Sequence, residues 1–350
     1  MRVLVAMSGG VDSSVAAALL RRAGHDVVGA TMKLWGGASD SGCCSVADVD
    51  DARRVAQQLG VAHHVFNFSD DFEGRVVGPY VAAHAAGRTP NPCIECNRHL
   101  KFERFLARAA VLGFDAVATG HHARVTSAGG RHQLRRGADA AKDQSYVLSM
   151  LGQDHLARVL LPVGELTKDQ VRATAAALGL RTAAKPDSQD VCFITSGGGR
   201  EAFLGERIEL HPARVVDAAT GEEVGAVPAV ELVTVGQRRG LGGGGRRRYA
   251  LAVDTRQRTV VVGTAADVLA ERAELDPTTL TWVDEPVAAG SPVLAQCSAH
   301  GPALPATFTG DAVRFSSPQR RVAPGQTVAL YDGDRVLGAA VATFSRFCDA

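Results

Sequence analysis

The chain has 350 residues, of which 46% are hydrophobic and 21% charged, as in a globular protein of two or three domains. Its net charge is +1, so a nucleic-acid partner would have to be met by local patches of charge. No apolar run reaches the roughly 18 residues of a membrane span, and the run at 3–7 is too short for a signal peptide. We therefore expect a cytoplasmic protein with no membrane partner.

Strand and helix signals alternate through the first half of the chain. Short apolar runs rich in β-branched residues predict strands at 2–7, 26–35, 62–68 and 115–120. Helical spacing of apolar residues predicts helices at 12–24, 45–60, 96–113 and 166–179. Ser45 with Asp48, and Thr167 with Gln170, are typical of helix N-terminal caps. Repeated strand–helix units predict an α/β fold with a doubly wound parallel sheet.

The pattern changes after about residue 195. The stretch 195–200, "TSGGGR", is typical of a linker, and from residue 207 short Val-rich runs alternate with hairpin-turn sequences such as "YDGDR". We expect two small β-domains that divide near residue 273. The predicted domains are a catalytic domain at 1–197, a central β-domain at 198–273 and a β-barrel-like domain at 274–350.

The loop "AMSGGVDSS" connects the first predicted strand to the first predicted helix. Gly9 and Gly10 allow close approach of the backbone, and the helix N-terminus behind them favours a bound phosphate. The hydroxyls of Ser8, Ser13 and Ser14 are further donors. Asp12 would repel bare phosphate, so we expect it to be a helix cap or a magnesium ligand.

Three cysteines need an explanation in a chain with no sign of secretion. Cys93 and Cys96 form Cys-x-x-Cys in "TPNPCIECNRHLKF", and Cys192 lies in "KPDSQDVCFI". Zinc, a redox dithiol, an iron–sulfur cluster and a sulfur-carrying nucleophile are all compatible with them. A structural zinc site needs four ligands, usually as two close pairs, which disfavours zinc. We assign no role to Cys43 and Cys44.

Several ordered motifs give the sequence a family resemblance. The glycine loop resembles the PP-loop of the N-type ATP pyrophosphatases. Together with "TPNPCIECNRHLKF", "ATGHHAR", "KDQSYVL", "KPDSQDVCFI" and "TVGQRRGLG", it resembles the bacterial tRNA-specific 2-thiouridylases. These motifs extend from residue 6 to about residue 242, and the weaker similarity of "APGQTVALYDGDRVLG" reaches nearly to the C-terminus.

The resemblance implies an ATP-dependent tRNA-uridine 2-sulfurtransferase. In that family the C2 oxygen of the wobble uridine, position 34, is adenylated, and a protein persulfide then supplies sulfur to C2. By motif position Cys96 matches the nucleophile and Cys192 the persulfide carrier. ATP with magnesium, tRNA and a persulfide donor, either a cysteine desulfurase or a sulfur carrier protein, are the implied cofactors and partners.

The binding residues implied by the resemblance fall into two sets. The ATP set is Ala6, Met7, Ser8, Gly9, Gly10, Val11, Asp12, Ser13, Met32 and Gly120. The tRNA set is Asn91, Pro92, Cys93, His121, Lys142, Asp143, Gln144 and Gln326. Many family members have Asp where this chain has Cys93, and a basic–aromatic pair of some members falls near Ser298 and Ala299 here.

Three alternatives stay open. The first is a [4Fe–4S] cluster with three cysteine ligands, Cys93, Cys96 and Cys192. The second is a PP-loop synthetase that adenylates a small carboxylate, which needs neither Cys96 with Cys192 nor two β-domains. The third is a non-catalytic metal- or redox-binding protein that uses Cys-x-x-Cys.

Overall fold

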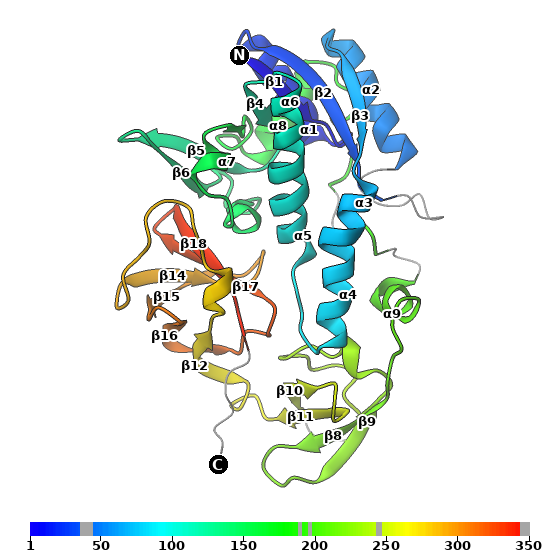
Figure 1. Ribbon diagram of the computed structural model, residues 1–350, viewed down its shortest axis with the longest axis vertical. Helices are drawn as coiled ribbons and strands as arrows, with labels where there is room; N and C mark the ends of the chain where they lie inside the picture. Colours follow the sequence, from blue (N-terminus) through cyan, green and yellow to red (C-terminus); the bar gives the residue numbers. More distant parts are fainter. Residues whose placement is uncertain (36–44, 188–190, 195–197, 243–246, 344–350) are drawn as a thin grey trace.

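The computed structural model of the protein describes residues 1–35, 45–187, 191–194, 198–242 and 247–343 (Figure 1). Its first sheet is parallel, with the strand order β3-β2-β1-β4-β7. The strands are β1 (Arg2–Ala6), β2 (Asp26–Lys33), β3 (His63–Asn67), β4 (Ala116–Ala118) and β7 (Val159–Leu160). The order reverses at β1, which pairs with β2 on one side and β4 on the other.

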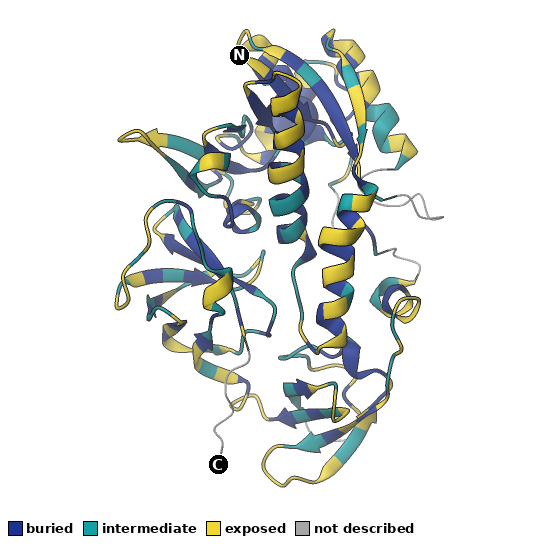
Figure 2. Cartoon of the chain, viewed as in Figure 1, coloured by how far each residue is buried: buried dark blue, intermediate teal, exposed yellow. Residues whose placement is uncertain are grey.

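Helices cover both faces of this sheet, as Figure 2 shows by the buried strands between helices with exposed outer faces. Alternate residues of β1 face opposite sides: Val3 and Val5 join one hydrophobic cluster, Leu4 and Ala6 another. The first cluster is shared with α1 (Val11–Arg22), α2 (Val46–Leu59) and α8 (Lys168–Ala177). The doubly wound fold is confirmed.

The predicted helix caps are confirmed. The Ser45 side chain accepts a hydrogen bond from the backbone N–H of Asp48, and α2 ends at Gly60 in the left-handed conformation. Thr167 and Gln170 form a complete capping box at the start of α8.

The helix that carries the Cys-x-x-Cys pair begins earlier than expected. It runs without a break through α5 (Pro92–Glu95), the π-helical segment η2 (Cys96–Arg104) and α6 (Phe105–Val111). Asn91 caps it by accepting from the Cys93 N–H at 3.1 Å, and Pro92 suits the first helical position. The prediction that Cys96 begins the helix is therefore wrong: Cys93 lies in the first turn and Cys96 in the next.

Two of the larger parts of the first domain have no counterpart among the predicted elements. One is the helical stretch of α3 (Ser69–Phe72), η1 (Glu73–Val77) and α4 (Gly78–Ala85), which covers the second face of the sheet. The other is the hairpin of β5 (Ala123–Ala128) and β6 (Arg131–Arg136). Arg124 and Arg135 of this hairpin both pair with Asp334, at 2.8 and 2.6 Å, and β6 pairs with β18.

The remaining strands form two further sheets. The second has the order β10-β11-β8-β9, made by β8 (Ala213–Asp217), β9 (Glu223–Val227), β10 (Tyr249–Asp254) and β11 (Thr259–Gly263). The third is antiparallel and contains β12 (Leu269–Glu274), β13 (Thr281–Trp282), β14 (Pro292–Gln296), β15 (Ala303–Phe308), β16 (Ala312–Arg320), β17 (Thr327–Asp332) and β18 (Arg335–Val341), extended by the β5–β6 hairpin. Because β12 pairs with β16, the chain enters the third sheet before residue 273.

Short helical segments connect these elements. They are η3 (Ser145–Leu148), α7 (Gln153–Leu156), α9 (Gly199–Gly205), η4 (Val230–Leu232) and η5 (Pro277–Thr279). The predicted linker at 195–200 runs into α9, and its residues 195–197 lie outside the described part of the chain. Among the described residues, no helix combines the length and apolar character that crossing a membrane requires.

Candidate nucleotide and transfer site

A cavity of about 420 Å³ lies at the carboxyl ends of β1 and β4, where the strand order reverses. This is the crevice in which doubly wound sheets bind ligands. Every residue of the predicted ATP set except Gly9 lines it, namely Ala6, Met7, Ser8, Gly10, Val11, Asp12, Ser13, Met32 and Gly120. The fold thus gathers the set around one cavity, and its assignment to ATP stays a prediction.

Two glycines let the loop pack closely at this crevice. Gly9 has φ +75°, and a Cβ there would lie 2.2 Å from the carbonyl oxygen of Asp48. A Cβ on Gly120 would lie 2.5 Å from the backbone nitrogen of Ser13, at the start of α1. A side chain at either position would force backbone to move. Gly9 therefore supports the loop from behind, and Gly120 brings the end of β4 against it.

Asp12 is an ionised carboxylate at the cavity wall and does not cap the helix. The N-cap of α1 is Gly10, with no side-chain capping bond. Both Asp12 oxygens accept from Lys168 Nζ, at 2.8 and 2.7 Å, and Oδ1 also accepts from His122 Nε2 at 3.1 Å. Burial raises the pKa of Asp12, but these hydrogen bonds outweigh it and the net pKa is lowered. The expectation of a helix cap is wrong, and the magnesium-ligand role stays a prediction.

The serine hydroxyls differ in role. Ser14 is fully buried and its Oγ donates to the carbonyl oxygen of Gly10 at 2.7 Å, so it braces the loop. Ser8 and Ser13 line the cavity, and the backbone N–H of Ser8 donates to Ser13 Oγ at 3.3 Å.

Lysines surround the cavity in a chain whose basic residues are mostly arginine. The sequence contains five lysines, and four of them line this cavity: Lys101, Lys142, Lys168 and Lys185. Lys168, the first residue of α8, is nine-tenths buried and connects Asp12 to Asp187. Lys185 Nζ donates to the Gly9 carbonyl oxygen at 3.0 Å and pairs with Asp48 and Asp51.

Sequence reasoning missed Lys168, Lys185, Asp187 and His122 as site residues. The scarcity of lysine could have indicated these positions. A lysine side chain carries a compact charge on a flexible stem, which a planar arginine guanidinium cannot replace, so the few lysines of an arginine-rich chain are candidates for a specific role.

The residues 142–144 of the predicted tRNA set differ in their surroundings: Lys142 is half-buried and Gln144 exposed. Lys142 Nζ pairs with Asp187 at 2.8 Å, and 38% of its side chain is exposed. Asp143 is buried in contacts with Arg136, Gly137 and Ser145, which fix its loop. The Gln144 side chain accepts from the backbone N–H of His122 at 2.8 Å.

His121, also in the predicted tRNA set, is buried in the cavity wall. Its Nδ1 lies 2.7 Å from Thr119 Oγ1, and its ring packs on Phe102. Burial lowers the pKa of His121 well below its ordinary value, so the ring is neutral near pH 7. Any contact that it makes with RNA is therefore made by a neutral imidazole.

The other members of the tRNA set gather at a second place, outside the cavity lining. Asn91, Pro92 and Cys93 start the long helix, with Cys93 exposed. Just before them, the Thr89 N–H donates to the Pro324 carbonyl oxygen at 2.7 Å, next to Gln326. The structure therefore brings these two segments, far apart in the sequence, side by side.

The two predicted sulfur-handling cysteines pack into one hydrophobic cluster. Cys96 is buried and Cys192 half-buried, and neither lines the cavity. Lys101, on the same π-helical segment as Cys96, does line it. Among the residues that the structure describes, which include Cys93, Cys96 and Cys192, no group of three His, Cys, Asp or Glu side chains is placed to hold a metal ion. The [4Fe–4S] alternative thus has no support. Cys43 and Cys44 lie outside the described residues.

The third sheet also reaches the cavity, through His300. The preceding residues Ser298 and Ala299 are fixed by Gln296, whose Nε2 donates to their carbonyl oxygens at 3.0 and 3.4 Å.

Comparisons with known proteins agree over nearly the whole chain. Family models match at residues 1–196 (tRNA methyl transferase HUP domain), 201–264 (tRNA methyl transferase PRC-barrel domain) and 279–342 (Aminomethyltransferase beta-barrel domain). The tRNA-specific 2-thiouridylase MnmA of Roseiflexus sp. is 45% identical, covering 96% of this chain and 98% of that protein. Those of Beutenbergia cavernae and Mycobacterium avium are 48% and 47% identical, covering 97% of this chain and 94% and 98% of their own lengths. A solved NMN synthetase from Francisella tularensis is 18% identical with a TM-score of 0.35, over 53% of this chain and 66% of its own.

Proposed function

The chain belongs to the tRNA-specific 2-thiouridylase family, and from this premise we propose that it is an ATP-dependent tRNA-uridine 2-sulfurtransferase. It converts the wobble uridine, position 34 of tRNA, into 2-thiouridine and releases AMP and pyrophosphate. The observation that carries the proposal is the cavity at the strand-order reversal, lined by the PP-loop, Asp12 and four lysines. A phosphate-handling site of this kind suits the activation of a carbonyl oxygen by ATP.

The first step makes the oxygen a leaving group. The C2 oxygen of the uridine attacks the α-phosphorus of ATP, an O–P bond forms, and the bond to pyrophosphate breaks. The backbone amides after Ser8 and the N-terminus of α1 stabilise the phosphate charge. Lys168 and Lys142 supply cations at the same wall.

Magnesium fits this site through Asp12. Mg²⁺ is commonly bound by one or two carboxylates together with substrate phosphates. Asp12 is ionised and lines the cavity, so its oxygens would hold the ion, which would neutralise phosphate charge. The bonds from Lys168 and His122 keep that carboxylate oriented.

The second step transfers sulfur. The terminal sulfur of a Cys192 persulfide attacks C2, and AMP leaves with the former C2 oxygen. Cys96, as thiolate, then attacks the Cys192 sulfur of the C2–S–S–Cys192 linkage. The S–S bond breaks, 2-thiouridine is released, and a Cys96–Cys192 disulfide remains for an external thiol reductant. The pairing of Cys96 with Cys192 follows from the family resemblance.

The helix start alters how Cys96 is activated. The favourable field of a helix N-terminus falls off beyond the first turn. Because the helix begins at Pro92, Cys96 receives less of this field than a residue at its first position would. Cys93 lies in that first turn, where it is exposed and suited to line the target-base pocket with Asn91 and Pro92.

The proposed tRNA contacts come from both places described above. Lys142 and His121 border the cavity, while Asn91, Cys93 and Gln326 belong to the second group. RNA bases read in this way are unstacked loop bases held in a pocket. The sulfur donor is a cysteine desulfurase or a sulfur carrier protein that loads Cys192.

The test is in vitro thiolation of unmodified tRNA with ATP, magnesium and a persulfide donor. We expect 2-thiouridine by mass spectrometry of the nucleosides, with one pyrophosphate released per thiolation. Pyrophosphate release without tRNA, driven instead by a small carboxylate and ammonia, would favour a synthetase. Absence of any ATP turnover would favour a metal- or redox-binding protein.

A further inference from the structure

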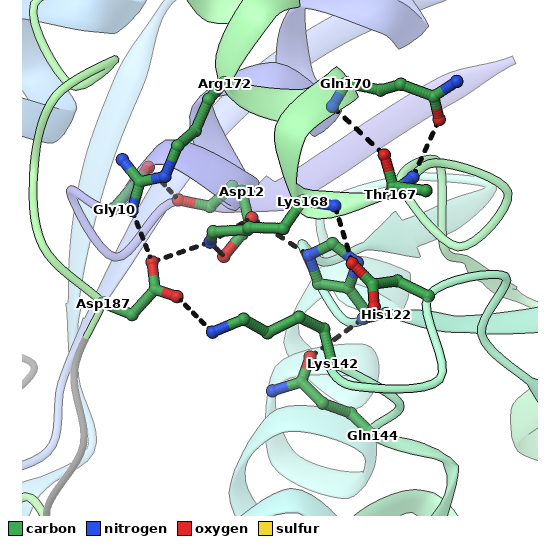
Figure 3. A network of polar contacts seen from close by, with 12 residues as sticks. Gly10, Asp12, His122, Lys142, Gln144, Thr167, Lys168, Gln170, Arg172 and Asp187 are labelled. Atoms are coloured by element: carbon green, nitrogen blue, oxygen red, sulfur yellow. Dashed lines mark hydrogen bonds and ion pairs between the residues drawn. The ribbon is translucent and has the colours of Figure 1, made fainter.

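The carboxylate of Asp187, which lines the cavity, lies among three cationic side chains (Figure 3), of which Lys142 and Lys168 also line the cavity. Oδ1 accepts from Lys168 Nζ at 2.8 Å and from Arg172 Nη2 at 2.9 Å, and Oδ2 accepts from Lys142 Nζ at 2.8 Å. Cationic groups that converge on one oxyanion group also suit a phosphate. Asp187 thus fills an anion site from within the chain.

The charges of this cluster limit what else can bind there. Lys142, Lys168 and Arg172 face the carboxylates of Asp12 and Asp187, which leaves one positive charge in excess. A pyrophosphate group that entered would meet both carboxylates as well as the cations. Like charges at contact distance in a partly buried site are strongly unfavourable. Tight binding therefore requires one carboxylate to leave or be neutralised.

Asp187 is the carboxylate that can leave. Both carboxylates have three side-chain contacts, but Asp12 lies in the first turn of α1, where the helix fixes its backbone. Asp187 lies outside any helix or strand. Arg172 Nη1 donates to the carbonyl oxygens of Ala183 and Lys185, so the backbone is held as far as residue 185. A local movement after that point releases Asp187 and leaves the three cations in place.

We propose that Lys142, Lys168 and Arg172 form the binding site for the pyrophosphate group of the nucleotide, and that Asp187 is an internal competitor which this group displaces. The inference rests on the proposed function, which makes pyrophosphate a product. Lys168 is then a catalytic residue, because it contacts the departing phosphates. Asp187 is a positioning residue: it orients the cations beforehand and, by returning to them, promotes release of pyrophosphate.

Binding of inorganic pyrophosphate to the full chain tests the competition directly. At fixed magnesium and low salt, without tRNA, isothermal titration calorimetry should show about tenfold tighter binding to Asp187→Asn than to the parent. Lys168→Ala should bind about tenfold more weakly, with partial recovery in Lys168→Arg. Asp50→Asn and Lys33→Ala remove equal charges outside the cavity lining and should match the parent. Equal or weaker binding to Asp187→Asn overturns the proposal.

A second measurement needs no variant that must fold. Hydrogen–deuterium exchange of the parent should rise in a peptide that contains the Asp187 amide when pyrophosphate is added, because Asp187 leaves its partners, whereas the amides of Ala183 and Lys185 should exchange as before. An unchanged or lower rate at Asp187 contradicts displacement. Product inhibition gives a kinetic readout: pyrophosphate should inhibit tRNA-dependent turnover at about tenfold lower concentration in Asp187→Asn. The binding and exchange experiments use neither tRNA nor sulfur. If thiolation fails but Asp187→Asn binds pyrophosphate more tightly, the proposed function alone is rejected. If thiolation succeeds but Asp187→Asn does not bind pyrophosphate more tightly, the competition alone is rejected.

Discussion

At the scale of single residues, Asp12 and the three cysteines have the clearest chemistry. Asp12 has two basic neighbours, Lys168 and His122, that hold it ionised beside the PP-loop. Cys93 is exposed and Cys96 buried although only two residues separate them, because successive turns of one helix face different surroundings. The two cysteines of the Cys-x-x-Cys motif thus have different environments, and each can be tested by its own substitution.

Replacing Asp12 with Ala should lower tRNA-dependent pyrophosphate release more than tenfold, a loss of over about 1.4 kcal/mol of transition-state stabilisation. The reason is loss of the proposed magnesium ligand and of the carboxylate that orients Lys168. Release is measured with a coupled pyrophosphate assay, with Asp50→Ala as the control for a lost surface charge. A variant that releases pyrophosphate at the parental rate would remove the PP-loop assignment.

Three serine variants should separate the persulfide scheme from an iron–sulfur cluster. Cys93→Ser should retain activity, because it only lines the base pocket, whereas Cys96→Ser and Cys192→Ser should form no 2-thiouridine. Protein purified without oxygen should contain no stoichiometric iron. An inactive Cys93→Ser variant, combined with a full cluster of iron per parent chain, would instead establish the three-cysteine cluster.

At the scale of elements, the ends of helices and strands determine the site. The PP-loop lies between β1 and α1, Gly120 follows β4, and Lys168 begins α8. These ends meet because the strands are parallel and the order reverses at β1. The contact between Gly120 and the first residues of α1 leaves no room for a side chain.

Gly120→Ala should therefore lower the free energy of unfolding by about 1–3 kcal/mol, since the new Cβ forces the backbone of β4 and α1 apart. The Michaelis constant for ATP should rise as well, because the same shift displaces the PP-loop. Gly74→Ala is the matched control: a Cβ there meets nothing within 4 Å, and its segment is helical. Chemical denaturation measures both, and equal stability of the two variants would contradict the packing argument.

At the scale of the whole molecule, ion pairs and hydrogen bonds between distant segments hold the three sheets together. The β5–β6 hairpin is paired with the third sheet through Asp334. His84 of α4, in the first domain, is almost fully buried, and its Nδ1 lies 3.2 Å from the Glu231 carbonyl oxygen in η4, in the central domain. The limits proposed for those domains, 1–197, 198–273 and 274–350, thus separate segments that remain in close contact.

Acid should weaken the contact made by His84. Burial lowers the pKa of His84 from 6.5 to about 4. The unfolded chain therefore binds the proton first as the pH falls, and stability is lost between pH 6.5 and 4, by roughly 3 kcal/mol. His84→Gln should be less stable than the parent at pH 7, with a difference that shrinks toward pH 4. Denaturation midpoints at several pH values measure this, with the exposed His64→Gln as control; parallel curves would contradict it.

Local signals determined much of this protein. Ser45 and Thr167 predicted their helix starts, the alternating apolar runs predicted the parallel sheet, and Gly9 and Gly10 marked the loop, because caps, periodicity and backbone freedom act over a few residues. Asn91 and Pro92 carried an equally local signal that was overlooked.

Only the tertiary structure decided which charges meet. Lys142, Lys168 and Asp187 come from three separate segments, and nothing in the spacing of these residues indicates that they converge. The same holds for Arg135 with Asp334, and for Thr89 with Pro324. Such contacts depend on how the chain closes long loops, and the free energy of that closure comes from burial spread over the whole core. Nearby residues therefore determine the helices and strands of this chain, whereas the electrostatics of its site depend on the complete fold.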